Sequence, residues 1–282
     1  MTDPLPSTES TDLQVRSLGS GSSGNAVILR SERATIAIDC GVGPGMLRQG
    51  LESFQSSFAE LDALLVTHEH IDHVRSLPSM IKSNCAIVSS AGSARATGIP
   101  APRWSEMSPG RDLTVGDMVI TMIPVSHDAA EPCGYHIHVQ GRRVTVVTDL
   151  GEASEPLQAH LEESDLIIVE ANHDEDTLRR SPYPERLKRR ILAPTGHLSN
   201  ADAGRLLAAA LRRSGRAPTI WLAHLSTTNN RPALAKATVE RALREVGSAS
   251  PVSVLPRRSM STVWTGAASS SPAVSRQLRF EF

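Results

Sequence analysis

The most restrictive feature of the sequence is a cluster of polar residues placed directly after an apolar segment. The run from Leu61 to Thr67 predicts a buried strand, and three histidines and one aspartate follow it within six residues, at His68, His70, Asp72 and His73. Side chains repeat every two residues along an extended backbone, so His68 and His70 point the same way and can ligate one metal ion. Where the chain turns into a helix, Asp72 and His73 point elsewhere and can serve a second ion. A solvated helix start capped by Asp72 is the alternative, but it suits a lone histidine better than this cluster.

Three further residues of ligand type each follow a predicted strand. His127, Asp149 and His224 come directly after apolar, strand-like runs. Any one of them alone is an ordinary loop residue, but loops alone rarely give three strands that end in this way. Loops converge where strands end, and imidazole and carboxylate are ligands that zinc accepts at about 2.0–2.2 Å. The pattern therefore predicts that these residues join the first cluster around metal ions.

The order of predicted elements favours two β-sheets covered by helices, an α+β architecture. Strands predominate early and late in the chain, and helical patterns lie between and after them. Gln140-Gly141 predicts a hairpin, and Asn229 or Asn230 is expected to cap the last helix. Helices are predicted over 72–83, 199–213 and 230–245, and strands over Leu13–Leu18, Asn25–Leu29, Thr35–Asp39, Leu61–Thr67, Met118–Val125, Tyr135–Val139, Arg143–Thr148, Leu166–Glu170, Thr219–Ala223, Val252–Leu255 and Ser261–Thr265.

Composition excludes several classes of protein. The 282 residues carry 29 Lys and Arg against 30 Asp and Glu, which excludes a uniformly basic nucleic-acid coat but allows a local basic patch. Three cysteines are too few for a disulfide framework. The polar start is unlike a signal peptide, and no run approaches the ~18–20 apolar residues of a membrane span, which predicts a soluble cytoplasmic protein with no membrane partner. Flexible tails are predicted over 1–11 and 266–282, around a single domain over 12–265.

The ligand pattern as a whole resembles the metallo-β-lactamase fold superfamily. The shared features are H-x-H-x-D-H, a strand-end histidine, a strand-end aspartate and a late histidine, and the resemblance covers about residues 12 to 265. It implies a four-layer αββα sandwich with the site at one edge of the sheets. It also implies two metal ions, one held by His68, His70 and His127 and the other by Asp72, His73 and His224, with Asp149 bridging both.

The segments around these residues resemble the YycJ family, also called WalJ. The matching segments, in chain order, are SLGSGSSGNA, LLVTHEHIDHV, HDAAEPCGYHI, VTDLG, VEANHD, YPERLKRRIL, GHLSNADA and LAHLSTTNN. The resemblance implies a DNA exonuclease that acts from the 5′ end and has a part in mismatch repair. Nucleic acid is therefore the expected substrate and partner.

Two divalent cations about 3.5–4 Å apart can share a hydroxide at neutral pH and clamp a phosphate for in-line attack. Zinc is the expected metal, and manganese and iron accept the same ligands. We assign Asp72 a second role as acceptor of the nucleophile's proton. Resemblance to tRNA-processing nucleases of the superfamily implies that His197 protonates the leaving oxygen or clamps the phosphate, and that Glu170 orients it. The alternative is that His197 only precedes a helix capped by Ser199 or Asn200.

A basic cluster lies between Glu170 and His197 in the sequence. Arginine and lysine there can hold a nucleic-acid backbone through its phosphates, which predicts non-specific, salt-sensitive binding. The alternative is an ordinary solvated helix face. Tyr183 is the one aromatic residue in the cluster, so extensive base stacking is not expected. The cluster comprises Arg179, Arg180, Arg186, Lys188, Arg189 and Arg190, of which Arg186, Lys188, Arg189 and Arg190 are the predicted substrate-binding residues.

Other polar residues receive weaker interpretations. His173 is either an outer partner of the site or an exposed loop residue, and His136 and His138 alternate along a strand as structural residues. The Gly19–Gly24 segment is better explained as a tight turn than as a phosphate loop.

Three functions remain open from the sequence. The leading one is a dinuclear metal-dependent phosphodiesterase acting on DNA. The second is a hydrolase of the same fold whose substrate is a small phosphodiester, a thioester or a lactone. The third is a protein without catalytic activity, either a metal-binding module or a DNA-bound accessory protein, against which the complete set of ligand residues argues.

Overall fold

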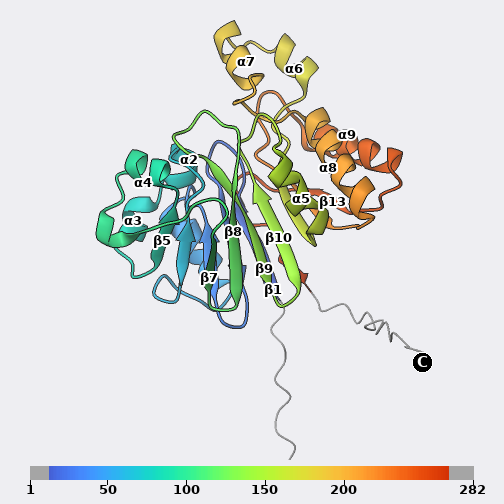
Figure 1. The fold of residues 1–282 in the computed structure, drawn as a ribbon. Coiled ribbons are helices and arrows are strands. Elements are labelled where there is room, and N and C mark those ends of the chain that lie inside the picture. The colour runs from blue at the N-terminus through green and yellow to red at the C-terminus, as the bar shows by residue number, and fades with distance from the viewer. Residues whose placement is uncertain (1–12, 267–282) are drawn as a thin grey trace, which may run out of the picture.

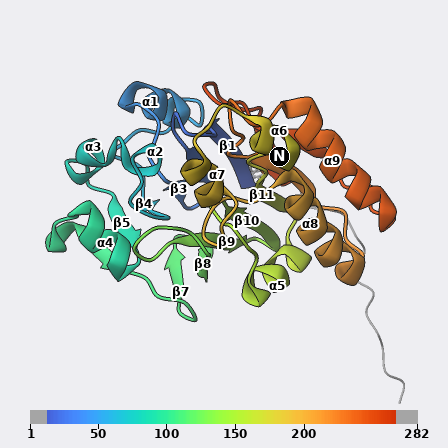
Figure 2. The ribbon, with the colours of Figure 1, turned by 90° about the horizontal axis from the view of Figure 1, so that it is seen from above.

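The computed structural model describes residues 13–266, so the predicted tails, apart from Gly266, lie outside the described residues. Two β-sheets of seven strands each pack face to face (Figure 1). Helices cover the outer face of each sheet, as the view from above shows (Figure 2). The chain therefore forms an αββα sandwich, and the predicted fold class is confirmed.

The first sheet contains the N-terminal strands and the last strand of the described chain. Its strand order is β14-β1-β2-β3-β4-β5-β6. The pairs from β14 to β3 are antiparallel, and those from β3 to β6 are parallel. Its strands are β1 (Leu13–Gly19), β2 (Ala26–Arg30), β3 (Thr35–Ile38), β4 (Ala63–Leu65), β5 (Ala86–Ser89), β6 (Trp104–Glu106) and β14 (Trp264–Gly266).

The second sheet has the order β13-β12-β11-β10-β9-β8-β7, antiparallel from β7 to β10 and parallel from β10 to β13. The predicted hairpin joins β9 to β10, with positive φ at Gln140 (51°) and Gly141 (76°), as a two-residue turn of this kind requires. The strands are β7 (Asp112–Val115), β8 (Met118–Pro124), β9 (Cys133–Val139), β10 (Arg142–Val147), β11 (Leu166–Glu170), β12 (Thr219–Ala223) and β13 (Val252–Val254).

Apolar side chains from both sheets form the central core. Val15 and Ile36 of the first sheet and Ile120 and Tyr135 of the second are all buried in it. The Tyr135 hydroxyl donates a hydrogen bond to the carbonyl of Val66 (2.8 Å), so its polar end is satisfied across the two layers. Two further apolar clusters lie outside, one between the first sheet and its helices and one between the second sheet and its helices.

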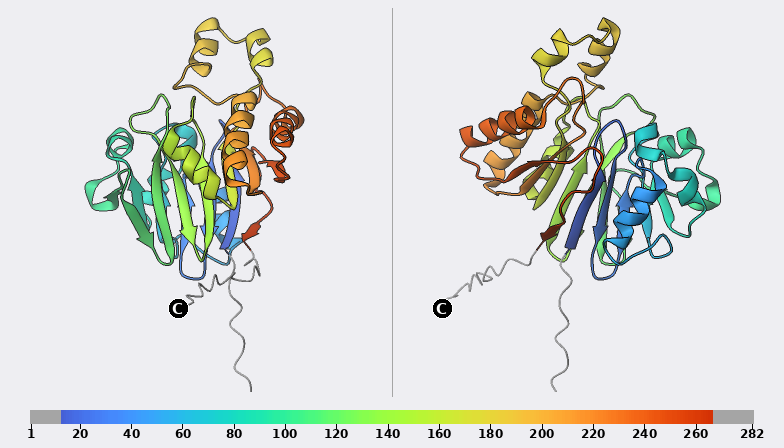
Figure 3. Two further views of the ribbon diagram at one scale, coloured as in Figure 1. Left: turned by 45° about the vertical axis from the view of Figure 1, so that its right-hand side comes forward. Right: turned by 180° about the vertical axis from the view of Figure 1, so that it is seen from behind.

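The helices lie on the two outer faces, except for a pair above the sandwich. Helices α6 and α7 stand beyond one end of the sheets (Figures 1 and 3), and α7 lies over the middle of the molecule in Figure 2. None of the helices within residues 13–266 is long and apolar enough to cross a membrane. The helices are α1 (Pro44–Glu52), α2 (Ile71–Val74), α3 (Leu77–Ile81), α4 (Ala91–Thr97), the 3-10 helix η1 (Ala101–Arg103), α5 (Glu155–Glu163), α6 (Glu175–Arg180), α7 (Glu185–Ile191), α8 (Asn200–Ser214) and α9 (Pro232–Glu245).

Two local predictions about helices are wrong. The helix expected over 72–83 is two helices, because the ring of Pro78 would clash with the carbonyl of Val74 in a continuous helix. Helix α9 begins at Pro232 with Arg231 as its N-cap and no side-chain cap bond, so neither Asn229 nor Asn230 caps it. The Asn230 amide donates instead to main-chain carbonyls beyond β11. Helix α8 is confirmed, and its N-cap Ser199 accepts a hydrogen bond from the main-chain N–H of Asp202.

Candidate metal centre

The His68–His73 segment leaves β4 and enters α2, and main-chain contacts fix it against a neighbouring loop. Asn25 N donates to the carbonyl of Asp72 (2.8 Å), and Cys40 N donates to that of His73 (2.8 Å). Gly41 packs so closely that a Cβ atom there would lie 1.6 Å from the Asp72 carbonyl oxygen. His70, not Asp72, is the N-cap residue of α2, and its side chain makes no cap bond. The backbone therefore presents the polar side chains instead of using them as caps.

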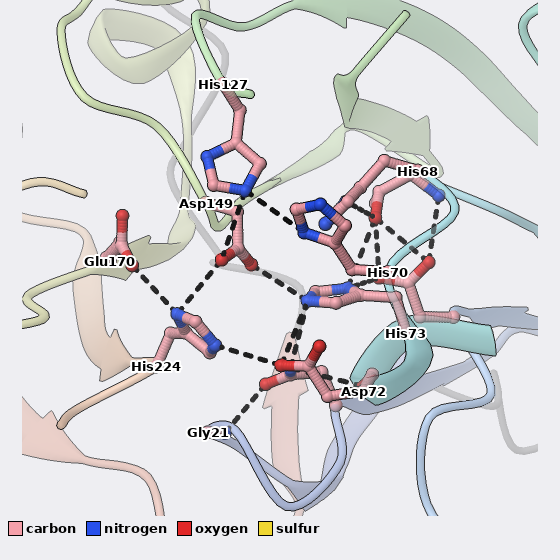
Figure 4. A network of polar contacts seen from close by, with 12 residues as sticks. Gly21, His68, His70, Asp72, His73, His127, Asp149, Glu170 and His224 are labelled. Carbon is pink, nitrogen blue, oxygen red and sulfur yellow. Dashed lines mark hydrogen bonds and ion pairs between the residues drawn. The ribbon is translucent and has the colours of Figure 1, made fainter. Parts of the chain in front are cut away.

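The structure brings together the first predicted group, His68, His70 and His127. Their candidate ligand atoms lie within 4.8 Å of one another. His70 Nδ1 and His127 Nε2 are 3.3 Å apart and face each other in Figure 4. His127 Nδ1 donates to the carbonyl of Gly196 (3.0 Å), which leaves its Nε2 directed at the other two histidines.

The second predicted group, Asp72, His73 and His224, is also assembled within 4.8 Å. Asp149 lies between the two groups: its Oδ2 is 2.8 Å from His73 Nε2, and its Oδ1 is 3.9 Å from His127 Nε2. Asp149 and His224 both have positive φ, 57° and 53°, which is uncommon for residues other than glycine. Such unfavourable backbone is often found at functional sites, and here it directs both side chains into the cluster.

Asp39 and Thr67 determine which ring nitrogen of His68 and of His73 carries a hydrogen. His73 Nδ1 donates to Asp39 Oδ2 (2.7 Å), and the Thr67 hydroxyl donates to the same carboxylate (2.9 Å). Because that hydroxyl has only one proton, its oxygen accepts from His68 Nδ1 (3.0 Å). Both Nδ1 atoms therefore carry hydrogen, and a lone pair on each Nε2 is available to a cation.

The buried charges of the cluster perturb one another strongly. Burial raises the pKa of Asp149, but the imidazoles of His224 and His73 outweigh this effect and hold it well below its usual value. Burial lowers the pKa of His73, but Asp39 and Asp149 outweigh it and raise that pKa to about 10. Burial lowers the pKa of His68 well below its usual value. Divalent cations can replace the protons that balance these carboxylates, since metal binding releases protons from its ligands.

The donor set fits divalent metal ions. Within residues 13–266, His68 Nε2 is buried without a hydrogen-bond partner. Asp149 Oδ2 lies 2.8 Å from His73 Nε2, and the raised pKa of His73 keeps a proton between these two atoms. A divalent cation can replace that proton, because metal ions bind imidazole nitrogen and carboxylate oxygen in their deprotonated forms. The buried His and Asp side chains are thus consistent with a dinuclear metal site.

Glu170 joins the predicted proton donor to one of the candidate metal ligands. Its Oε1 lies 2.9 Å from His197 Nδ1 and 2.8 Å from His224 Nδ1, so the expected Glu170–His197 pair is present. Its Oε2 accepts from the main-chain N–H of Leu150 and of Leu198, at 3.1 Å each. Burial raises the pKa of Glu170, but the imidazoles of His197 and His224 lower it to about 2. Burial lowers the pKa of His197, but Glu170 outweighs burial and raises it.

A cleft of about 170 Å³ opens beside these residues. His197 and His224 line it, and Ser22, Tyr183 and Arg190 contribute further polar groups. The cleft lies under α7, so a ligand within it would contact both the histidines and this helix.

The predicted basic cluster belongs to α6 and α7. Arg190 pairs with Asp128, whose other carboxylate oxygen is 3.4 Å from His127 Nε2, and this pair ties α7 to the centre. The Lys188 ammonium is engaged by the carbonyl of Arg179 and by Glu185. Arg186 and Arg189 are exposed and have no ion pair within the described residues.

Some residues of the site differ from expectation or were missed. His173 is buried (1% exposed), so its interpretation as an exposed loop residue is wrong. Asp39, Thr67 and Asn25 were not predicted as site residues. Asp39 directly follows the strand at Thr35–Ile38, so the strand-end rule that identified Asp149 applies to it as well. Asn25, whose amide is 3.0 Å from His73 Nε2, has no comparable sequence signal.

The fold and the buried site together define a class of protein, the metal-dependent hydrolases built on an αββα sandwich. A family model described as "Beta-lactamase superfamily domain" matches residues 34–224, more than half of the chain. The chain therefore belongs to the metallo-β-lactamase superfamily, and it is a metal-dependent hydrolase.

Individual relatives narrow the comparison. The chain is 31% identical over 236 residues to "Exodeoxyribonuclease YycJ" of Bacillus anthracis, a match that covers 82% of this chain and 89% of the relative. It is 31% identical to "Exodeoxyribonuclease WalJ" of Streptococcus pneumoniae, with 81% of this chain and 87% of the relative covered. Among solved structures, the metallo-beta-lactamase fold protein YhfI from Bacillus subtilis matches with a TM-score of 0.67 at 17% identity, over 90% of this chain and all of YhfI (100%). The predicted family is confirmed by these matches.

Proposed function

We propose that this hydrolase is a DNA exonuclease that removes nucleotides from the 5′ end with two divalent metal ions, zinc being the metal that the ligand set favours. The observation that carries the proposal is the closure of His68, Asp149 and their partners around one buried centre beside a cleft under the basic helix α7. DNA is the proposed substrate because two relatives at 31% identity are named exodeoxyribonucleases. Nucleic-acid backbone is the proposed partner, and the cytoplasm the proposed location.

The proposed ligand sets follow the two assembled groups, with Asp149 in contact with both. When bound, the ions would lower the pKa of a water molecule and neutralise charge on the phosphate. The proposed ligands are His68, His70 and His127 for one ion and Asp72, His73 and His224 for the other.

Asp72 is proposed to accept the proton of the attacking water as well as to hold an ion. Its side chain is 18% exposed, so water can reach it, and His224 Nε2 lies 3.3 Å from its Oδ2. Burial raises the pKa of Asp72, but His224 and His73 outweigh it and lower that pKa, so the carboxylate is ionised at neutral pH.

His197 is proposed to protonate the leaving oxygen. Glu170 accepts from Nδ1, which fixes the ring and leaves Nε2 to donate, and the raised pKa keeps the second proton on the ring near neutral pH. Glu170 acts through His197 and is a positioning residue. Arg186, Lys188, Arg189 and Arg190 are proposed to hold the DNA backbone; Arg186 and Arg189 are the best placed, because Lys188 and Arg190 already have partners in the protein.

The test couples metal analysis to digestion of single-stranded and duplex DNA labelled at the 5′ or the 3′ end. We expect about two equivalents of metal and early release of the 5′ label. Release of the 3′ label first would refute the proposed direction, and the absence of DNA cleavage by fully loaded protein would refute the nuclease assignment. Turnover of a small phosphodiester, thioester or lactone without turnover of DNA would support the alternative hydrolase.

A comparison of leaving groups tests His197. A p-nitrophenyl phosphodiester needs no proton on its leaving oxygen, whereas DNA does. The His197→Ala protein should therefore lose about 10²–10⁴-fold on DNA and far less on the nitrophenyl ester. Equal losses on both substrates would contradict the acid role.

A further inference from the structure

A second pocket lies on the other side of the loop that closes the cleft. It has a volume of about 360 Å³, and its charged residues are Arg75, Arg257 and Arg258. Ser23, Gly43 and Met46 also line it. We call these six residues the arginine pocket.

The loop between the cleft and the arginine pocket is built directly on candidate metal ligands. Ser20 Oγ accepts from the main-chain N–H of His224 (2.8 Å). Asn25 Oδ1 accepts from the main-chain N–H of Gly21 (2.7 Å), while its amide lies 3.4 Å from Asp72 Oδ2. Ser22 lines the cleft and Ser23 lines the arginine pocket, so a single loop separates the two spaces. Asn25 therefore joins Gly21 of this loop to Asp72.

The arginine pocket carries positive charge that the protein does not neutralise. Within residues 13–266, none of its three arginines pairs with a carboxylate. Arg75 donates to the carbonyl of Ser23 (2.6 Å), and Arg257 donates to the carbonyls of Leu225 (3.1 Å) and Ser226 (2.6 Å). These bonds use only part of the five donors of each guanidinium. Arg258 is exposed and makes no hydrogen bond within the described residues.

The main chain adds to the positive field of the pocket. Helix α1 starts at Pro44, its N-cap Gly43 lines the pocket, and it has no side-chain cap and no acidic residue in its first turn. The N-terminus of a helix favours anions, so it acts in the same direction as the three guanidinium groups.

The positions of the charges suggest a path for a polyanion. Arg190 is on the His127 side of the cluster, through Asp128, whereas Arg75 follows the ligand segment on the Asp72 side. Figure 4 shows His127 and Asp72 at opposite edges of the cluster. A chain of phosphates that enters beneath α7 and crosses the cleft therefore leaves it over Ser22 and Ser23.

We propose that the arginine pocket is a second phosphate-binding subsite, which holds the backbone of a polynucleotide beyond the nucleotide that is cleaved. The proposal rests on the proposed nuclease function. It adds that the enzyme favours polynucleotides over short substrates, because only a longer chain reaches this subsite. Arg75 and Arg258 contact the phosphate, and Arg257 is a positioning residue that ties the pocket to the carbonyls of Leu225 and of Ser226, which lines the cleft. The contacts are to the backbone and carry no sequence preference.

The test compares an Arg75→Gln/Arg258→Ala protein with wild type and with the matched control Arg241→Ala/Arg244→Ala, which removes two exposed arginines of α9. Binding of the metal-loaded proteins to a nuclease-resistant, single-stranded phosphorothioate 20-mer is followed by fluorescence anisotropy at several salt concentrations. Loss of two phosphate contacts should reduce the slope of log K against log salt by about 1.4, which is about 25-fold in Kd at 0.1 M salt. The control should behave as wild type, and Arg258→Ala alone, which breaks no hydrogen bond, should give about half of the change in slope.

The possible outcomes distinguish failure of the subsite from failure of the nuclease function. A pocket variant with the Kd and salt slope of the control overturns the subsite, while DNA cleavage by wild type leaves the proposed function standing. Wild-type protein that neither binds nor cleaves DNA overturns both. An equal loss of affinity for a dinucleotide and for the 20-mer overturns the placement beyond the cleaved nucleotide. A saturable site for inorganic phosphate that is lost in the variant, with no change in 20-mer binding, assigns the pocket to a free anion and overturns the polynucleotide assignment.

Discussion

Replacing Glu170 with glutamine changes one atom of a side chain that accepts four hydrogen bonds, and at least two of the four are lost. One carboxylate oxygen accepts from two imidazoles, and the other accepts from the main-chain N–H of Leu150 and of Leu198. Glutamine has one oxygen and one NH₂ group, so whichever way the amide lies, its NH₂ group faces two donors. No rotation of the side chain restores the original pattern.

The size of the effect follows from these contacts. If the amide faces the histidines, two charge-assisted hydrogen bonds of about 1.5–3 kcal/mol each are lost, and the unfolding free energy should fall by about 3–6 kcal/mol. If the histidines instead move their protons from Nδ1 to Nε2, the unfolding free energy changes little. His224 Nε2 then carries a proton directed at Asp72, and it no longer has a lone pair to bind a metal ion. Loss of such an outer partner typically costs 10–100-fold in metal affinity, to which the lost positioning of His197 adds.

The assay measures unfolding by urea, metal content by mass spectrometry, and turnover of both DNA and a nitrophenyl phosphodiester. Glu163→Gln is the matched control, because Glu163 is an exposed carboxylate that pairs with Arg143 on the surface. We expect Glu170→Gln to lose metal and turnover on both substrates, unlike His197→Ala, which should keep its metal. A Glu170→Gln protein with wild-type stability, metal content and turnover would refute the role of the carboxylate as a shared support.

Three other predictions concern stability, metal and pH. Removing metal with a chelator should lower the melting temperature and abolish hydrolysis, and re-addition of zinc should restore both; an unchanged melting temperature would contradict a metal bound within the fold. Gly41→Ala should destabilise the protein by at least about 3 kcal/mol and reduce metal content, because its Cβ would lie 1.6 Å from the Asp72 carbonyl, whereas Gly43→Ala has nothing within 4 Å and should be neutral. Burial lowers the pKa of His136 to about 3, below the usual value near 6.5, so the unfolded chain binds the extra proton first. Its stabilising contribution is present above about pH 6.5 and is lost as the pH falls toward 3, by a few kcal/mol. Denaturation of His136→Gln should show a shallower loss of stability over that range, and an identical slope would contradict this account.

The sequence predicts well which residues gather at the candidate metal centre, because their signal is local. One segment of six residues contains His68, His70, Asp72 and His73. The ends of predicted strands identify three more, without knowledge of their partners: His127, Asp149 and His224. A polar residue at the end of a strand lies at the edge of the sheet where other strands also end. The sheet therefore brings these residues together without any sequence signal that links them. The pairing of Glu170 with His197 required the resemblance to tRNA-processing nucleases, since nothing local joins two residues separated by α6 and α7.

The residues that were missed depend on contacts between distant segments. Asp39 acts only because the end of β3 lies beside the end of β4, a parallel neighbour reached through α1. Asn25 contacts the candidate ligands because its loop packs against Gly41 and Asp72. The break of the 72–83 helix at Pro78 was readable from the sequence, whereas the arginine pocket joins residues as distant as Arg75 and Arg258 and no sequence period connects them.

Two buried carboxylates support the centre from opposite sheets. Asp39, at the end of β3 in the first sheet, binds His73 directly and His68 through Thr67. Glu170, the last residue of β11 in the second sheet, binds His224 and His197. Each sheet thus holds half of the site with its own carboxylate, and neither half offers a complete ligand set alone. The central core that joins the sheets therefore sets the separation of the two halves, and the packing of apolar residues far from the metals determines whether one centre forms.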